Sequence, residues 1–580
     1  MLFCEDRNLP DSRAGSEPHH AALARVEKIV TEDSKAQYAL QYSLDVSAQK
    51  ANAMTTTPAQ RPNILLIVVD DLGFCDLGAF GGEMPTPNID RLAQEGRILT
   101  GYHVAPACSP TRAMLFSGTD HHLAGLGQMA ESLHKFAGWR GKPGYEGYLN
   151  ERSLSLAEIL RDNGYTTCMS GKWHLGREAA HSPKAKGFEK SFAMLGGAAH
   201  YFTQESPHVT PEGVIQKAQY REDGELVDLP EDFYITDLYT DKMIAYLDQH
   251  DTRPFFAYAA YTAPHWPLQA PDRYLAKFRG RYDEGYEPVR ANRLAAMKAK
   301  GVLPPDFVPY PGRPASAEVP MWDQLSVDER RKESRRMEIY AAMLNSLDDN
   351  VGRLIDHLKR IGKYDNTFVF FMSDNGPDGL TDQSPLLRHS ASFFDNRLEN
   401  MGRRGSFVAA GPRWAEVSAT PFRSVKGSTA EGGITAAAIV RLPGAEGSSK
   451  PLAALTHVTD LLPTLLELAG IANPGRSYRG RDVNPIAGAS MLSYLRGATK
   501  HIHDQNYVLG EELFGQRSLQ LGDWKLLWLD PPEGVGAWQL YDLLGNRAET
   551  NDLMALQPAI AAELERAWQQ YVERNGVILS

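Results

Sequence analysis

Two apolar runs without polar interruptions mark the centre of this chain, and each ends in side chains that carry oxygen. Residues 63–69 precede Asp70 and Asp71, and residues 368–372 precede Ser373, Asp374 and Asn375. Continuous apolar runs of this length are typical of parallel strands that are buried on both faces. Because ligands bind at the carboxyl ends of such strands, we expect the two ends to contribute to one site.

The remaining pattern predicts an α/β fold. Residues 165–170 and 255–261 are expected to form further core strands, and apolar positions at helical spacing predict helices over 155–163, 336–358 and 456–470. From about residue 503 the pattern changes to short alternating segments at 507–510, 518–521, 524–529 and 538–542, followed by a helix over 558–574. This second pattern predicts a small antiparallel sheet with one helix.

Three regions follow from these patterns. Residues 1–60 form a polar extension that we expect to be poorly ordered, with one helical piece at 21–30 and with Met54 as the expected natural start. Residues 61–500 form the predicted catalytic domain, and residues 501–580 the C-terminal subdomain. We find no signal peptide and no apolar run long enough to span a membrane, so no membrane partner is expected.

Composition limits the class of partner. The formal net charge of −11 argues against nucleic acid as the main partner, although a local cationic pocket can still bind an anion. The cysteines at 4, 75, 108 and 168 have neither disulfide nor zinc spacing. A reducing compartment follows, so we expect the cytoplasm rather than the periplasm. The oligomeric state is not predicted.

The segment 105–118 combines a helix start with a reactive side chain. Ser109 is a good N-cap and Pro110 fits the first helical position, which places Cys108 just before the helix N-terminus. Free N–H groups favour an anion there, and Arg112 lies about one turn further on and can add a fixed positive charge beside the cysteine. The alternative is an ordinary buried structural cysteine.

The two strand ends offer a metal site. Asp70, Asp71, Asp374 and Asn375 all supply hard oxygen ligands, which favours calcium, or else magnesium, over zinc. Two adjacent carboxylates at a buried strand end repel each other unless a cation lies between them. A single aspartate at a strand end could instead be a turn or capping residue.

Cationic and imidazole groups follow other predicted strands. If the chain stays extended past Gly171, Lys172 and His174 point the same way, into one site. Prolines on both sides of His265 stiffen the loop after residues 255–261, so that this imidazole could reach a substrate. Taken singly, each of these side chains could also be structural.

Several of these segments together resemble the type I sulfatases. The string Cys-x-Pro-x-Arg at 108–112, followed by Ala-x-x-x-Ser-Gly, is similar to the first signature of that family, and Gly-Lys-Trp-His-x-Gly at 171–176 is similar to the second. The segments 141–147 and 263–268 resemble bacterial arylsulfatases in particular. The resemblance implies an alkaline-phosphatase-like α/β sandwich with a large mixed central sheet and a small C-terminal α+β subdomain.

The resemblance also implies roles for individual residues. Cys108 would be oxidised to formylglycine by a formylglycine-generating enzyme, and the hydrated aldehyde would attack sulfur. One divalent ion, usually calcium, would be held by Asp70, Asp71, residue 108, Asp374 and Asn375. The catalytic set would comprise Cys108, Arg112, Lys172, His174, His265 and Lys426. Of these, Lys172 and Lys426 would contact the sulfate oxygens, His174 the formylglycine hydroxyl and His265 the leaving group. The family often has arginine where Thr435 stands here, which puts the packing around Lys426 in question.

The predicted function is therefore hydrolysis of an aryl sulfate monoester, a small molecule, to a phenol and sulfate. A formylglycine-dependent phosphonate or phosphate ester hydrolase is the nearest alternative. A protein that binds sulfate esters without converting Cys108 is an alternative of another class. An ordinary thiol hydrolase would require Cys108 to lie beside a histidine base.

Overall fold

A parallel core of strands carries the site, and its order follows from the apolar runs of the sequence. The computed structural model describes residues 61–579 except 137, 211, 250, 251, 382 and 449. The predicted extension 1–60, with its helical piece and Met54, lies outside the described residues.

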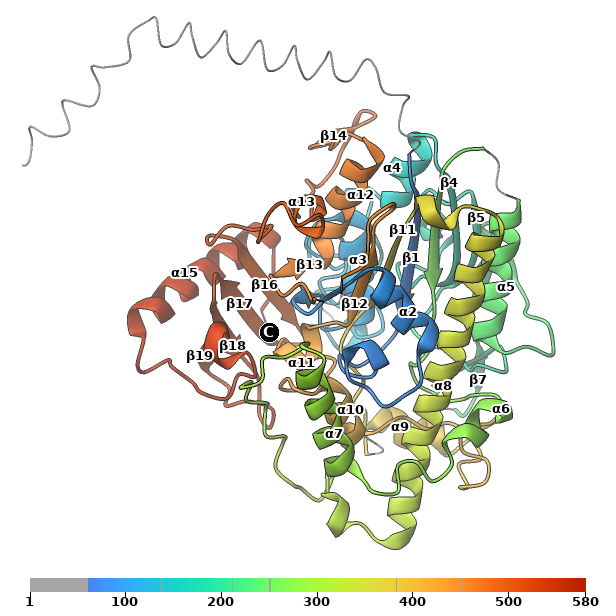
Figure 1. Ribbon diagram of the computed structural model, residues 1–580, viewed down its shortest axis with the longest axis vertical. Helices are drawn as coiled ribbons and strands as arrows, with labels where there is room; N and C mark the ends of the chain where they lie inside the picture. The colour runs from blue at the N-terminus through green and yellow to red at the C-terminus, as the bar shows by residue number, and fades with distance from the viewer. Residues whose placement is uncertain are drawn as a thin grey trace, which may run out of the picture. The chain divides into compact units, whose positions relative to one another are not determined.

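The main sheet has nine strands in the order β2-β12-β11-β1-β10-β4-β5-β8-β9 (Figure 1). In that order the strands are Arg97–Leu99, Ala438–Arg441, Thr367–Ser373, Asn63–Val69, Phe255–Ala260, Thr166–Lys172, Lys190–Met194, Tyr220–Glu222 and Glu225–Val227. The five strands from β11 to β5 are parallel, and antiparallel strands extend both edges. This is the large mixed sheet that the resemblance implied.

Helices cover both faces because alternate residues of each central strand point to opposite sides. In β1, Leu65 and Ile67 belong to a core shared with α2, α5 and α8, whereas Leu66 and Val68 belong to a core shared with α3, α4, α12 and α13. These helices are Pro87–Glu95, Ile235–Asp248 and Val327–Arg360 on the first face, and Cys108–Ser117, Leu156–Asp162, Leu461–Ala469 and Leu492–Leu495 on the second.

Helix α8 is longer than predicted. The apolar stripe predicted its buried part, but the helix begins at Val327 because Ser326 and Glu329 form a reciprocal capping box. Its first turns are polar and lie beyond the stripe from which the helix was predicted. Among the described residues, none of the helices combines the length and apolar composition that a membrane-spanning helix needs.

The C-terminal strands form a separate antiparallel sheet, as predicted. They are β16 Val508–Leu513, β17 Gln516–Leu521, β18 Trp524–Trp528 and β19 Trp538–Asp542, and they pack on α15 Pro558–Asn575 (Figure 1). Leu519, Leu526 and Leu540 share a core with Leu564 and Trp568 of α15. The domain boundaries at 60 and 500 stay predictions.

Smaller elements connect these layers. They are β3 Tyr102–His103 paired with β13 Thr456–His457, β6 Glu205–Val209 paired with β7 Ile215–Lys217, β14 Ser477–Tyr478 paired with β15 Arg481–Asp482, and the helices α6 Asp272–Leu275, α7 Tyr286–Ala299, α9 Pro385–Ala391, α10 Pro412–Ala419, α11 Glu431–Ile434 and α14 Leu543–Asn546. Pairing of β3 with β13 places the residues before α3 next to those before α12.

Candidate functional site

Four neighbouring strands end at the candidate site. The register pairs Val69 of β1 with Ser373 of β11, and on the other side Val68 with Ala260 of β10. Asp70 and Asp374 therefore follow adjacent parallel strands, as expected of a ligand site at strand ends. Strand β4 lies beyond β10 and ends at Lys172. The fold thus brings the two predicted strand ends together, with a cation beside them.

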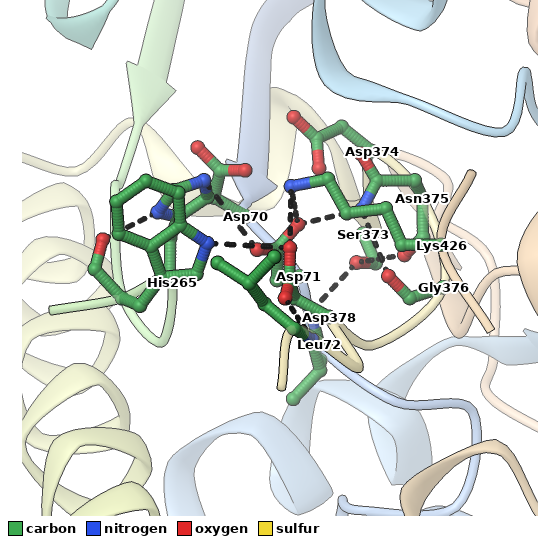
Figure 2. A network of polar contacts seen from close by, with 12 residues as sticks. Asp70, Asp71, Leu72, His265, Ser373, Asp374, Asn375, Gly376, Asp378 and Lys426 are labelled. Carbon is green, nitrogen blue, oxygen red and sulfur yellow. Dashed lines mark hydrogen bonds and ion pairs between the residues drawn. The ribbon is translucent and has the colours of Figure 1, made fainter. Parts of the chain in front are cut away.

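The four predicted oxygen ligands, Asp70, Asp71, Asp374 and Asn375, converge and are buried (Figure 2). In the described part of the chain, each has at least one buried oxygen without a hydrogen-bond partner: Asp71 Oδ2, Asp374 Oδ1, Asn375 Oδ1 and both oxygens of Asp70, of which Oδ2 forms an ion pair with Lys172. Buried oxygens without donors cost free energy unless a cation satisfies them. These oxygens are all hard ligands, so the donor set fits calcium or magnesium.

Asp71 is the most crowded of these carboxylates. Its Oδ1 accepts from Asn375 Nδ2 at 2.7 Å and lies 2.6 Å from Lys426 Nζ, while Oδ2 lies 3.5 Å from His265 Nε2 (Figure 2). Burial raises the pKa of Asp71 to about 8 against the opposing charge of Lys426, and Asp70 adds repulsion. A bound cation would favour the charged form of this carboxylate.

Cys108 lies within the helix rather than before it, so the predicted capping is wrong. Helix α3 begins at Cys108, its N-cap is Ala107, and Ser109 and Pro110 occupy its first turn. The first-turn N–H groups have no intrahelical partner, so a proline is tolerated there as well as at the first position. Cys108 is still at the positive end of the helix, next to the carboxylates.

The thiol itself is poorly suited to attack. Burial and the neighbouring carboxylate of Asp70 raise the pKa of Cys108 far above its usual range. Cys108 Sγ lies within 4.8 Å of a ring nitrogen of His265, and no hydrogen bond joins the two among the contacts of the described residues. A thiol hydrolase needs an activated thiolate, so this environment disfavours that alternative.

Arg112 contacts the carboxylates rather than the cysteine. Its Nε and Nη2 lie 2.9 and 2.8 Å from Asp374 Oδ2, and Nη2 lies 3.5 Å from Asp70 Oδ2. Its Nη1 donates to the carbonyl of Lys172 at 2.9 Å. The predicted fixed charge is present, and it also ties α3 to the ends of β1, β11 and β4.

The extended segment that was expected to carry both Lys172 and His174 ends at Lys172, so the two side chains are positioned by different backbone conformations. Lys172 Nζ lies 2.5 Å from Asp70 Oδ2. His174 has a left-handed φ of 58°, and its Nε2 lies 3.2 Å from Glu131 Oε2. Its Nδ1 is buried without a hydrogen-bond partner in the described chain. A Cβ on Gly197 would lie 2.9 Å from the ring, so glycine leaves room for this orientation.

The surroundings of His265 disfavour the charged form of its ring. Burial and the charge of Lys426 hold the pKa of His265 well below its ordinary value. Its Nδ1 lies 2.6 Å from the carbonyl oxygen of Trp266, which can only accept, so Nδ1 carries the proton and Nε2 faces the site. Any proton that His265 gives to a leaving group must first reach Nε2.

The loop that carries Lys426 is anchored from both sides. Lys426 N donates to the carbonyl of Pro377, and Gly427 N donates to the carbonyl of Pro106, just before the cysteine helix. Thr435 stands where the family often has arginine, but Arg547 Nη2 lies 3.4 Å from its hydroxyl and Arg547 Nε lies 3.1 Å from Glu431. A guanidinium from the C-terminal region therefore supports this loop.

Two charged residues at the site were not predicted. Glu131 binds His174, and Asp378 lies 3.5 Å from Lys426 and accepts from Trp266 Nε1 at 3.2 Å. Asp378 comes soon after the strand end at Asp374, and this position in the sequence could have identified it as a site residue. Glu131 lies in the segment between α3 and α4, and neither periodicity nor a motif singles it out.

Comparison with known proteins identifies the relatives of this arrangement. The sulfatase family profile matches residues 62–471. The chain is 44% identical over 529 residues to an uncharacterized sulfatase of Schizosaccharomyces pombe, covering 90% of this chain and 95% of that protein. It is 37% identical over 451 residues to an arylsulfatase of Klebsiella aerogenes, covering 77% and 94%. The solved structure of Ps i-CgsB with k-i-k-neocarrahexaose superposes with a TM-score of 0.61 at 24% identity, covering 88% and 93%.

Proposed function

This chain belongs to the sulfatase family, and on that premise we propose that it hydrolyses aryl sulfate monoesters with a formylglycine at position 108 and a bound calcium ion. Membership supports sulfuric ester hydrolysis and the alkaline-phosphatase-like fold. The nucleophile, the identity of the ion and the aryl substrate are the parts that we propose.

One observation carries the proposal. A buried group of oxygen donors without partners lies at the N-terminus of the helix that starts with Cys108, and Lys172 and Lys426 flank it. Oxygen donors hold a hard cation, and two ammonium groups suit an anionic ester. A non-catalytic binding protein would not need this combination of metal ligands, cations and a buried cysteine.

Each residue of the site has a separate proposed role. When Cys108 is converted, the hydrated aldehyde supplies the nucleophilic oxygen. Asp70, Asp71, Asp374 and Asn375 would hold the divalent cation, which would supply Lewis-acid stabilisation of the sulfuryl oxygens. Lys172 and Lys426 stabilise the charge that develops on the sulfuryl oxygens. Glu131 accepts from His174 Nε2, which leaves Nδ1 free to accept a proton from the hydroxyl at position 108.

His265 is proposed to protonate the leaving oxygen. Burial, and after it the charge of Lys426, lower the pKa of His265, and an anionic ester that pairs with Lys426 would offset only the second cause. Nε2 would then take up a proton from solvent and give it to the leaving oxygen. Trp266, Phe394 and Phe407 belong to one apolar cluster beside this histidine, and the rings of Trp266 and His265 are 4.8 Å apart. These aromatic side chains support a phenol as the leaving group, as does the similarity to the Klebsiella arylsulfatase.

A formylglycine-dependent phosphonate or phosphate ester hydrolase is the nearest alternative. It could use the same converted residue and the same cations. Asn375 supports the sulfatase, because a neutral fourth ligand lowers the negative charge that a monoanionic sulfate ester must approach.

The test combines the mass of the peptide that contains residue 108 with a measurement of turnover. We expect the peptide that contains residue 108 to show the mass of an aldehyde in place of a thiol after co-expression with a formylglycine-generating enzyme. The same preparation should turn over 4-nitrophenyl sulfate, and Cys108→Ala should be folded and inactive. An active protein whose residue 108 remains a thiol, or an active Cys108→Ala, would overturn the proposed nucleophile.

A further inference from the structure

The backbone adopts a left-handed conformation at Asp71, one of the four oxygen ligands of the proposed calcium site. Its φ is 65°. This conformation is uncommon for a residue with a Cβ, and it persists only where the surrounding structure holds it. The direction of the Asp71 carboxylate, which accepts from Asn375 and pairs with Lys426, depends on this conformation. The contacts that hold the backbone after Asp71 therefore bear on the metal site.

Two buried side chains accept the backbone N–H groups that follow Asp71. Leu72 N donates to Ser373 Oγ at 3.1 Å (Figure 2). Gly73 N donates to Asp76 Oδ2 at 2.8 Å. Leu72, Ser373 and Asp76 are fully buried. Because a buried N–H group without an acceptor costs free energy, these two side chains stabilise the turn that begins at Asp71.

Ser373 also joins this turn to the second pair of predicted ligands. It is the last residue of β11, directly before Asp374, and its Oγ donates to the carbonyl oxygen of Asn375 at 2.8 Å (Figure 2). A hydroxyl donates one hydrogen bond and can accept others, so both contacts can be made at once. One hydroxyl thus connects the backbone after Asp71 with the backbone of Asn375.

Asp76 is itself oriented by two helices that lie outside the sheet. Tyr340 of α8 donates from its hydroxyl to Asp76 Oδ2 at 2.6 Å, and the same hydroxyl lies 3.3 Å from the carbonyl oxygen of Asp71. Arg293 of α7 lies 2.5 Å from Asp76 Oδ1 through its Nη1. The Arg293 and Tyr340 side chains are buried as well. The acceptor of the Gly73 N–H group is therefore held in a single orientation by a buried network.

We propose that Ser373 and Asp76 are positioning residues for calcium binding. They hold the left-handed conformation of Asp71, so that its carboxylate faces Asn375 and the other ligands. Groups that orient metal ligands set the affinity of a site without contacting the ion. The inference rests on the calcium ion of the proposed function, and it extends the site from its ligands to the residues that fix their geometry.

The test measures calcium affinity on the full chain. Wild type, Ser373→Ala and Asp76→Ala are stripped with a chelator, checked for folding by circular dichroism, and titrated with calcium chloride in a calorimeter. We expect each variant to bind calcium about ten- to a hundredfold more weakly than wild type, which is the range for loss of a group that orients metal ligands. Asp76→Ala leaves Arg293 paired with Glu83 at 2.7 Å. Ser373→Ala removes a single hydroxyl and decides the question if Asp76→Ala does not fold.

Thr367→Val is the matched control. Thr367 is the first residue of β11, at the opposite end from Ser373, and it is equally buried. Its hydroxyl donates to the carbonyl of Lys363 at 2.7 Å, away from the turn after Asp71. Like Ser373→Ala, this variant removes one buried hydroxyl from β11. It should lower the free energy of unfolding and leave the calcium affinity unchanged.

The outcomes separate this inference from the proposed function. Wild-type calcium affinity in folded Ser373→Ala would overturn the positioning role and leave the proposed calcium site intact. An equal loss of affinity in Thr367→Val would also overturn it, because the effect would then follow from any lost hydroxyl of β11. Wild-type protein that binds no calcium would contradict the proposed ion itself, and this inference with it.

Discussion

Replacing Arg112 tests whether the buried cation holds the site together. The Arg112 side chain is fully buried, and its guanidinium binds Asp374, the carbonyl of Lys172 and the hydroxyl of Tyr258, with Asp70 at 3.5 Å. Arg112→Ala removes all of these contacts. It removes the Arg112 ion pair of Asp374, and among the described residues it leaves Lys172 as the ion-pair partner of Asp70.

The magnitude follows from the burial of both partners. Breaking a fully buried ion pair by removing one side costs about 3–5 kcal/mol, since the remaining charge stays desolvated. This is a large share of a total stability of about 5–15 kcal/mol and corresponds to a change of about 150- to 5,000-fold in the folding equilibrium, at about 1.36 kcal/mol for each factor of ten. A bound cation compensates the same carboxylates, so the loss should be smaller with calcium than with a chelator.

Urea unfolding of wild type and Arg112→Ala, with calcium and with chelator, measures both effects. Arg331→Ala is the control, because Arg331 forms an exposed pair with Asp328 at 3.2 Å and its removal should have no measurable effect. Equal unfolding midpoints for wild type and Arg112→Ala under both conditions would refute the reasoning. A loss that calcium does not reduce would show that the carboxylates do not bind the ion.

Three further predictions concern the metal, the acid and a distant ion pair. Asp374→Ala should lose bound calcium and activity together, and calcium retained at the wild-type level would contradict the ligand set. His265→Ala should slow phenyl sulfate about a hundredfold or more and 4-nitrophenyl sulfate much less, because the poorer leaving group depends more on protonation; equal losses would argue against an acid. Against the cost of its burial, Arg293 lowers the pKa of Glu83 from 4.5 to about 2. Glu83 therefore contributes about 3 kcal/mol to the free energy of unfolding above pH 4.5, and this contribution is lost as the pH falls toward 2. Glu83→Gln should flatten the dependence of the unfolding free energy on pH in this range.

The sequence predicted the core and the strand ends well because both are local patterns. An apolar run such as 63–69 can only be buried on both faces, and the residue after it is then at a strand end whatever the rest of the chain does. The antiparallel C-terminal sheet was predicted for the same reason, from alternation within each short strand.

Side-chain directions were less predictable. Lys172 and His174 were expected on one side of an extended segment, but the left-handed φ of His174 turns the chain between them. The start of α3 at Cys108 was missed because a proline is equally acceptable throughout the first helical turn. Both depend on single backbone angles that hydrophobic periodicity does not report.

Long-range partners were not predictable from local patterns. Glu131 meets His174, and Arg547 supports the Lys426 loop from the C-terminal region. The contacts of Glu511 with His121 and His457 join three segments that are far apart in the sequence. Such contacts depend on how the layers pack, and they fix details of the site that its motifs leave open.

The most direct test of the proposed function compares three esters on one preparation. Protein co-expressed with a formylglycine-generating enzyme is assayed for kcat/KM on an aryl sulfate, the matching aryl phosphate and a phenyl phosphonate ester. We predict a preference for the sulfate by orders of magnitude, and its loss in Cys108→Ala. A preference for the phosphonate ester would contradict the proposed reaction and assign the site to the alternative hydrolase.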